Sequence, residues 1–224
     1  MSWAEVMKIN DNVTKPLNEQ IREARFLPIR IITATGTYTP EKTGLYKVIC
    51  VGAGGNAGGD TGVGSTSKLA YAEGGGGGGV AIKTLRLSST TSYNVTVSTT
   101  ASFSTELSAT AGQGSSASSP NSGGTAAGGD ENYVGSKGVA FASTLKVGLA
   151  GGSVGVAITE LTRTNSTTYT DFSSYITDLR YGDGLLGYGG GAPTLVYSSG
   201  SAYSSVKRTG QPAAVIIIPL EMEE

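Results

Sequence analysis

Six consecutive glycines, Gly74 to Gly79, constrain the fold more than any other stretch of this 224-residue sequence. They belong to a set of 35 glycines, none of which precedes Gly36. Glycine loses more conformational freedom on folding than any other residue, so a chain that orders this many must gain stability elsewhere. Two interpretations are open: the tracts are flexible linkers, or they are extended polyglycine helices whose N–H and C=O groups pair between neighbouring segments.

The composition excludes several classes of function. Histidine is absent, which removes Ser-His-Asp and Cys-His catalysis and histidine metal sites. A net charge of -1 without a basic stripe argues against a nucleic-acid partner. We therefore expect no enzymatic activity, no cofactor and no metal. A glycosidase carboxylate pair among Asp171, Asp178 and Asp183 is the remaining enzymatic alternative.

Residues 1–28 differ from the rest of the chain, because they contain no glycine and many charged side chains. Two short helices are expected there, the second over 15–26, with Leu17 and Ile21 in a narrow apolar stripe. One interpretation is a helix packed on the following domain. The other is an attachment or oligomerisation segment, for which Trp3, Leu17 and Ile21 are the candidate residues.

Residues 29–224 are expected to form one glycine-rich β-sandwich domain. Two apolar stretches, 45–51 (LYKVICV) and 213–220 (AAVIIIPL), predict core strands. Their pairing would bring the ends of the domain together, with the glycine tracts leaving from one end of an antiparallel sandwich. The other predicted strands are 29–33, 36–39, 80–87, 93–97, 101–110, 139–147 and 154–161, and 169–181 remains open between a loop and helical turns. Cys50, inside an apolar run, is expected to be a buried structural thiol.

The order of these elements resembles the glycine-rich domains of phage and prophage tail-fibre proteins, over roughly residues 35 to 220. The resemblance is carried by TPEKTGLYKVICVGAGG, by polyglycine before VAIKTLRLS, and by SYNVTV, LSATAG and AAVIII. The opening WAEVMKIN…KPLNEQIRE is similar to the start of small tail-fibre proteins in prophages of Gram-positive bacteria. The glycine-rich domain of certain animal receptor kinases is similar in pattern, and pairs polyglycine helices with a jelly-roll-like sandwich.

This resemblance implies a mainly β fold: a jelly-roll-like antiparallel sandwich with packed polyglycine II helices or glycine-rich loops, after a short α-helical N-terminal segment. It implies ordered glycine tracts and tip loops that touch the host. The structural glycines are then Gly74, Gly75, Gly76, Gly77, Gly78, Gly79, Gly189, Gly190 and Gly191. Tyrosines interleaved with Ser and Gly suit a binding surface; the alternative is that they cover the sandwich or the glycine helices. The receptor-binding candidates are Tyr181, Tyr188, Tyr197 and Tyr203.

The function expected from the resemblance is a phage or prophage tail-fibre or tail-tip protein that binds a saccharide or protein on the host bacterium. The alternative is a structural or assembly component of a virion or phage-like bacteriocin without receptor contact. Expected partners are the host receptor and other tail-fibre or baseplate proteins. The oligomeric state is open between a homotrimer and a monomer docked on a separate fibre. Without a signal-peptide core or a membrane span, we expect synthesis in the bacterial cytoplasm, no membrane insertion and a final place in the virion.

Overall fold

The computed structural model describes residues 27–59, 72–114, 122–138, 148–149, 185–192, 194–199, 202–207 and 209–223. These residues form strands, turns and extended segments, and no helix occurs among them. The N-terminal helices, with Trp3, Leu17 and Ile21, lie outside the described residues, as do the strands predicted over 139–147 and 154–161 and the open segment 169–181. The mainly β prediction is confirmed.

Two five-stranded antiparallel sheets make up the larger part of the structure. We call them sheet A and sheet B. Sheet A has the order β1 (Arg30–Ile32), β15 (Ala214–Met222), β3 (Gly44–Val51), β6 (Val80–Leu87) and β11 (Glu131–Tyr133). Sheet B has the order β10 (Ala126–Ala127), β9 (Leu107–Ala109), β8 (Ala101–Phe103), β7 (Tyr93–Val97) and β2 (Gly36–Tyr38).

The two apolar strands predicted to pair, β3 and β15, are neighbours at the centre of sheet A. They run antiparallel in a register that places Ile216 opposite Ile49, with an irregularity between Pro219 and Glu221. Proline cannot donate to a strand ladder, so its position at this irregularity is expected. The pairing joins the first long strand of the domain to its last, and this prediction is confirmed.

The core lies between the two sheets. Tyr46, Val48 and Cys50 alternate along β3 and face Val95 and Phe103 of sheet B, and all five are at most 1% exposed. Burial raises the pKa of the Cys50 thiol to about 12, so Cys50 is the buried thiol that its apolar surroundings predict. On the other face of sheet A, a second apolar cluster contains Ile49, Val51, Val80 and Ile216. Burial on both faces explains why β3 and β15 are continuously apolar.

The single strand predicted over 101–110 is wrong. The structure has a hairpin instead, in which β8 pairs with β9 and Phe103 lies opposite Leu107. The turn residue Ser104 has a φ of 51°, and the Glu106 N–H donates to the Phe103 carbonyl. Both Phe103 and Leu107 face the core, so their spacing satisfies a straight strand and a hairpin equally well.

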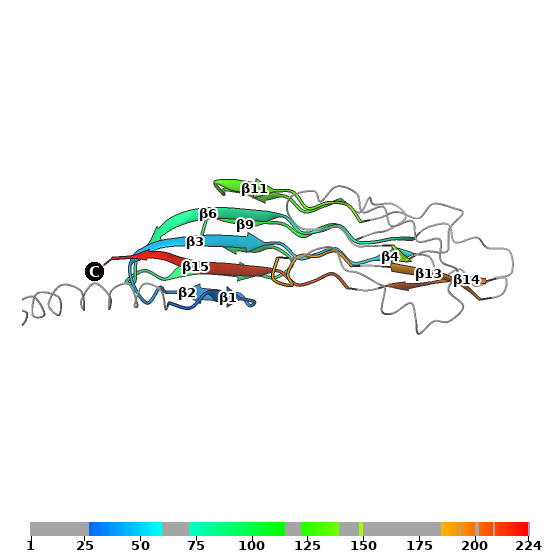
Figure 1. The fold of residues 1–224 in the computed structure, drawn as a ribbon, viewed down its shortest axis with the longest axis horizontal. Coiled ribbons are helices and arrows are strands. Elements are labelled where there is room, and N and C mark those ends of the chain that lie inside the picture. Colours follow the sequence, from blue (N-terminus) through cyan, green and yellow to red (C-terminus); the bar gives the residue numbers. More distant parts are fainter. Residues whose placement is uncertain are drawn as a thin grey trace, which may run out of the picture.

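The molecule is elongated, with the sandwich at one end and two small sheets toward the other (Figure 1). We call these ends the root and the tip. The root holds the C-terminus and the tip holds β4, β13 and β14 (Figure 1). The tip strands are β4 (Gly58–Gly59) paired with β5 (Ala72–Glu73), and β12 (Gly148–Leu149), β13 (Thr194–Ser199) and β14 (Ala202–Lys207) in one sheet. Extended glycine-rich segments connect the two ends.

The packing of Phe103 predicts a large loss of stability when its ring is removed. Phe103 is fully buried and stacks on Tyr93, with ring centroids 5.4 Å apart. We expect Phe103→Ala to lower the free energy of unfolding by about 3–5 kcal/mol. Denaturant titration measures this change, and a thiol reagent that reaches Cys50 only in opened molecules should label the variant faster. Val134→Ala, at a side chain that is 62% exposed, is the control and should change stability by less than about 0.5 kcal/mol.

Candidate functional site

A layer of extended segments lies between the sandwich and the tip, and we call it the glycine layer. Gly74 to Gly79 run through its interior, and all six are buried. Backbone hydrogen bonds join this tract to segments that are far apart in the sequence. The segments of the layer are 52–56, 74–79, 110–114, 122–125, 134–138, 189–192 and 209–212.

The hydrogen bonds of the six-glycine tract repeat every three residues. Each successive N–H donates to a different neighbouring segment, and the fourth returns to the first. The bonds run from Gly75 to Ala192 (2.9 Å), Gly76 to Gln113 (3.0 Å), Gly77 to Ser136 (2.9 Å), Gly78 to Gly189 (2.8 Å) and Gly79 to Thr110 (3.1 Å). A β-strand has a period of two and bonds in one plane, so this tract is not a strand of a larger sheet.

The carbonyl groups of the tract follow the same period. Gly76 and Gly79 accept hydrogen bonds from Gly55 and Gly52, at 2.7 and 2.9 Å. A neighbouring pair of segments repeats the pattern, since Thr110 and Gln113 donate to Thr125 and Ser122 at 2.8 Å each. The buried backbone groups of the layer are therefore satisfied by one another, as burial requires.

Close packing of backbones is the reason for glycine here. A Cβ atom on Gly75 or Gly78 would lie 1.9 Å from the carbonyl oxygen of Gly55 or Gly52. The same holds on neighbouring segments, where a Cβ on Gly135 would lie 2.1 Å from the Gly77 oxygen. These obstacles are backbone atoms of other segments, which cannot rotate away. The layer therefore tolerates no side chain at these positions.

Two amide side chains complete the layer beside its last segment. The Gly210 N–H donates to Oδ1 of Asn56 at 3.0 Å, and the Gly190 N–H donates to Oε1 of Gln211 at 3.1 Å. The Gln211 N–H itself donates to the Gly190 carbonyl at 2.8 Å. The side-chain oxygens of Asn56 and Gln211 thus accept the hydrogen bonds of the Gly210 and Gly190 N–H groups in place of a backbone carbonyl.

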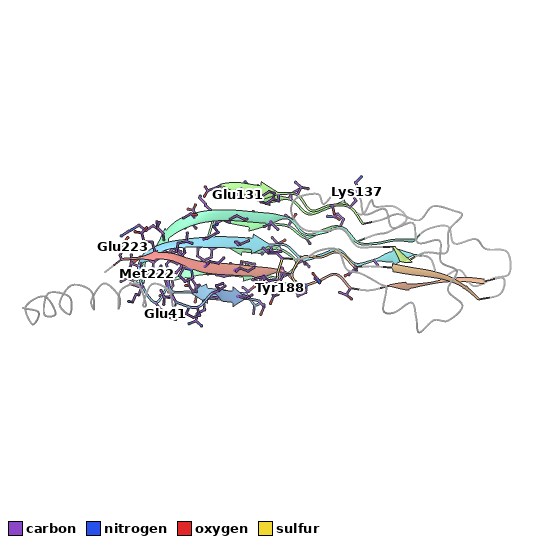
Figure 2. All side chains as sticks on the ribbon, in the orientation of Figure 1. Glu41, Glu131, Lys137, Tyr188, Met222 and Glu223 are labelled. Atoms are coloured by element: carbon purple, nitrogen blue, oxygen red, sulfur yellow. The ribbon has the colours of Figure 1, made fainter. Side chains whose placement is uncertain are left out.

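A tight hairpin fastens the layer to the sandwich. Leu185 and Tyr188 exchange two backbone hydrogen bonds around a turn in which Leu186 and Gly187 have φ of 53° and 86°. Leu185 and Tyr188 pack against the outer cluster of sheet A, while Leu186 is 65% exposed. Figure 2 places Tyr188 at the end of the sandwich that faces the glycine layer, away from Glu41 and Glu223 at the root. A bulky residue at positive φ is strained.

The structure separates the candidate tyrosines. Tyr188 packs at the junction of sandwich and layer, whereas Tyr197 and Tyr203 belong to the β13–β14 hairpin at the tip. In that hairpin Tyr197 lies opposite Ser204 and Tyr203 opposite Ser198. These are adjacent register positions of the hairpin. Tyr181 and the acidic candidates Asp171, Asp178 and Asp183 lie outside the described residues.

The predicted glycines Gly189, Gly190 and Gly191 are buried in the layer beside the six-glycine tract. The sequence interpretation missed Asn56, Gln211 and the β13–β14 hairpin. The hairpin had a readable signal, because two strand-like stretches flank Gly200-Ser201, a two-residue turn pair. The amides had none, since their partners are 154 and 21 residues away in the chain.

The described residues do not form a metal-binding cluster. Within them, no three His, Cys, Asp or Glu side chains lie close enough to hold a metal ion. Nor does that part of the chain contain a helix long and apolar enough to cross a membrane. The sequence matches no protein-family model and no curated protein.

Contact with backbone atoms predicts that alanine is not tolerated in the layer. We expect Gly78→Ala to lower the free energy of unfolding by roughly 1–3 kcal/mol or more, because its Cβ would overlap the Gly52 oxygen. Gly36→Ala is the matched control, since nothing lies within 4 Å of its added Cβ. That variant should be neutral or about 0.4–1 kcal/mol more stable. Equal effects of the two changes in thermal or denaturant unfolding would contradict a close-packed layer.

Strain at Leu186 predicts a stabilising substitution. Glycine adopts positive φ without a Cβ penalty, so we expect Leu186→Gly to raise the free energy of unfolding by about 1 kcal/mol. Leu220→Gly is the control, because Leu220 is similarly exposed, at 48%, but lies in β15. There the loss of a side chain from a strand should destabilise. Denaturant midpoints compare the two variants, and a less stable Leu186→Gly protein would show that Leu186 makes a contact worth more than its strain.

Proposed function

We propose that this chain is a phage or prophage tail-fibre or tail-tip protein whose tip binds a saccharide or protein on the host surface. The observation that carries the proposal is that the segments of the glycine layer all lead from the sandwich to the tip or back from it. Segments 52–56, 110–114 and 189–192 run from the sandwich toward the tip, and 74–79, 122–125 and 209–212 return. The described residues between them, 57–59, 72–73, 194–199 and 202–207, lie together at the tip (Figure 1).

The glycine segments in this proposal are polyglycine II helices. That helix has three residues per turn and no internal hydrogen bonds. The three-residue bonding period, the burial of Gly74 to Gly79 and the exclusion of a Cβ support it. The jelly-roll-like description of the sandwich also belongs to the proposal. It is supported by sheet A, where β15 separates β1 from β3 so that neighbouring strands are distant in the sequence.

A rigid spacer explains the architecture of such a protein. A loop on a flexible linker loses entropy when it binds, whereas a loop held on a rigid support has already lost it. The glycine layer holds several loop ends side by side without side chains between them, so distant parts of the chain can form one surface. The root is then free for attachment, because both Leu27 and Glu223 lie on the sandwich.

The test is adsorption of the labelled protein to cells of a strain that the parent phage infects. We expect the double variant Tyr197→Ser/Tyr203→Ser to lower adsorption about tenfold, because both residues belong to the hairpin at the tip. Tyr133→Ser, on sheet A, is the control for loss of a tyrosine away from the tip and should adsorb normally. An unreactive Cys50 verifies that each variant is folded.

Failure of the wild-type protein to adsorb to such cells would contradict receptor binding. The alternative, an assembly component without receptor contact, makes the opposite prediction. In that case removal of residues 1–27 abolishes incorporation into the particle, and loop changes near Tyr188 leave the host range unaltered.

A further inference from the structure

We propose that the root of sheet A is a contact surface between copies of this chain. The surface lies on the outward face of sheet A, along its β1 edge and its root end, and we call it the root patch. It contains Ile29, Ile31, Leu45, Ile218 and Leu220. This inference concerns the opposite end of the molecule from the proposed receptor site and does not rest on that proposal.

The register of sheet A places these side chains together. Ile31 lies opposite Ile216, which lies opposite Ile49 of the outer cluster. Continuing the β1–β15 register by one residue sets Ile29 beside Ile218. Leu45 lies opposite Glu221, next to Leu220 in the strand irregularity. The patch thus follows the β1 edge and the root end of a single sheet face, and Leu185 and Tyr188 cover the neighbouring part of that face.

These side chains are unusually exposed for aliphatic residues on a sheet. Ile29 is 54% exposed, Ile31 is 44%, Leu45 is 36% and Leu220 is 48%. Single exposed aliphatics are common on protein surfaces, whereas a contiguous group indicates an interaction site. The covered half of the same face shows the contrast, since Ile216 is 1% exposed and Ile49 is 8%.

The shape of the patch fits a flat partner. A hollow at the root lies on the opposite side of sheet A, lined by Leu27, Pro28, Tyr46 and Pro219 among others, and has a volume of about 10 Å³. That volume holds about one water molecule. The patch itself is the flat face of a sheet, and such a face fits another flat surface of a macromolecule.

The charges on this face point to a second copy as that macromolecule. Lys47 and Glu221 lie on the outward face beside the patch, and neither forms an ion pair with another described residue. By contrast, Arg30 and Arg86 are paired with Glu41 and Glu223. One unpaired cation and one unpaired anion beside an apolar surface are self-complementary. In a symmetric contact Lys47 of one copy can meet Glu221 of the other, and the reverse.

A strongly charged partner has less to recognise here. A polyanion needs several cations, and the outward face offers only Lys47 without an ion pair in the described part.

The place where the chain enters the domain also favours a second copy. The described chain starts at Leu27, two residues before Ile29 of the patch. Copies that meet at this surface therefore bring their Leu27 residues toward one another.

The test is the mass of the full-length protein in solution, measured by light scattering. One chain has a mass of 22.6 kDa, and we expect the wild-type protein to have twice that mass, because a reciprocal contact closes as a dimer. Ile31→Glu should raise the dissociation constant at least about tenfold, because it sets a charge against an apolar surface. Leu186→Glu is the matched control, since Leu186 is 65% exposed but lies outside the patch, and this variant should associate as the wild type does.

A charge exchange tests the pairing of the copies. Lys47→Glu and Glu221→Lys should each weaken association, and the double variant should restore it. A folding defect would not be repaired in this way. Three results would overturn the proposal: a wild-type mass of 22.6 kDa at about 0.1 mM, far above the Kd of a specific contact; association that is insensitive to Ile31→Glu; or dissociation caused by Leu186→Glu. A monomeric result would leave the receptor proposal standing, because that proposal concerns the tip.

Discussion

Hydrogen bonding between backbones without side chains between them is the interaction on which the whole structure depends. In the glycine layer, N–H and C=O groups of distant segments meet at 2.7 to 3.1 Å, and the Cα atoms lie so close to neighbouring carbonyls that a Cβ on Gly75 would be 1.9 Å from an oxygen. The layer buries almost no apolar side-chain surface, so the usual hydrophobic driving force is weak there. Its stability must come from satisfied backbone groups and close contact, against the large entropy that glycine loses on folding.

The sandwich supplies what the layer lacks. A core that includes Tyr46, Phe103 and Ile217 holds the strands from which the glycine segments leave and to which they return. Because β3 and β6 pair along their whole length, Val51 and Val80 lie side by side, and the segments that follow and precede them start in register. The hairpin of Leu185 and Tyr188 performs the same task for segment 189–192. The apolar core thus fixes the positions at which the glycine segments begin and end. Hydrogen bonds between the segments then keep them aligned as far as the tip.

The sequence predicted features that depend on nearby residues better than features that depend on residues far apart in the chain. Continuous apolar stretches identify β3 and β15, because burial on both faces leaves no other composition for a central strand. The β8–β9 hairpin could not be told from one strand, since Phe103 and Leu107 face the core in both arrangements. The roles of Asn56 and Gln211 were equally out of reach. Their acceptor oxygens serve Gly210 and Gly190, and nothing local to either amide marks the partner. Strain at Leu186 is also invisible in sequence, because leucine rarely takes a positive φ.

The sequence by itself determined that the chain would be mainly β, that its glycines would decide the architecture, and that histidine chemistry was excluded. Each of these follows from residue types alone: side-chain branching, the missing Cβ and the missing imidazole. Only the tertiary structure decided which glycine segments are neighbours, that their bonds repeat every three residues, and that Tyr188 lies at the junction while Tyr197 and Tyr203 lie at the tip. Glycine carries no side chain to select a partner. The neighbours of each segment are therefore chosen by the strands at its ends, through contacts between residues that are far apart in the chain.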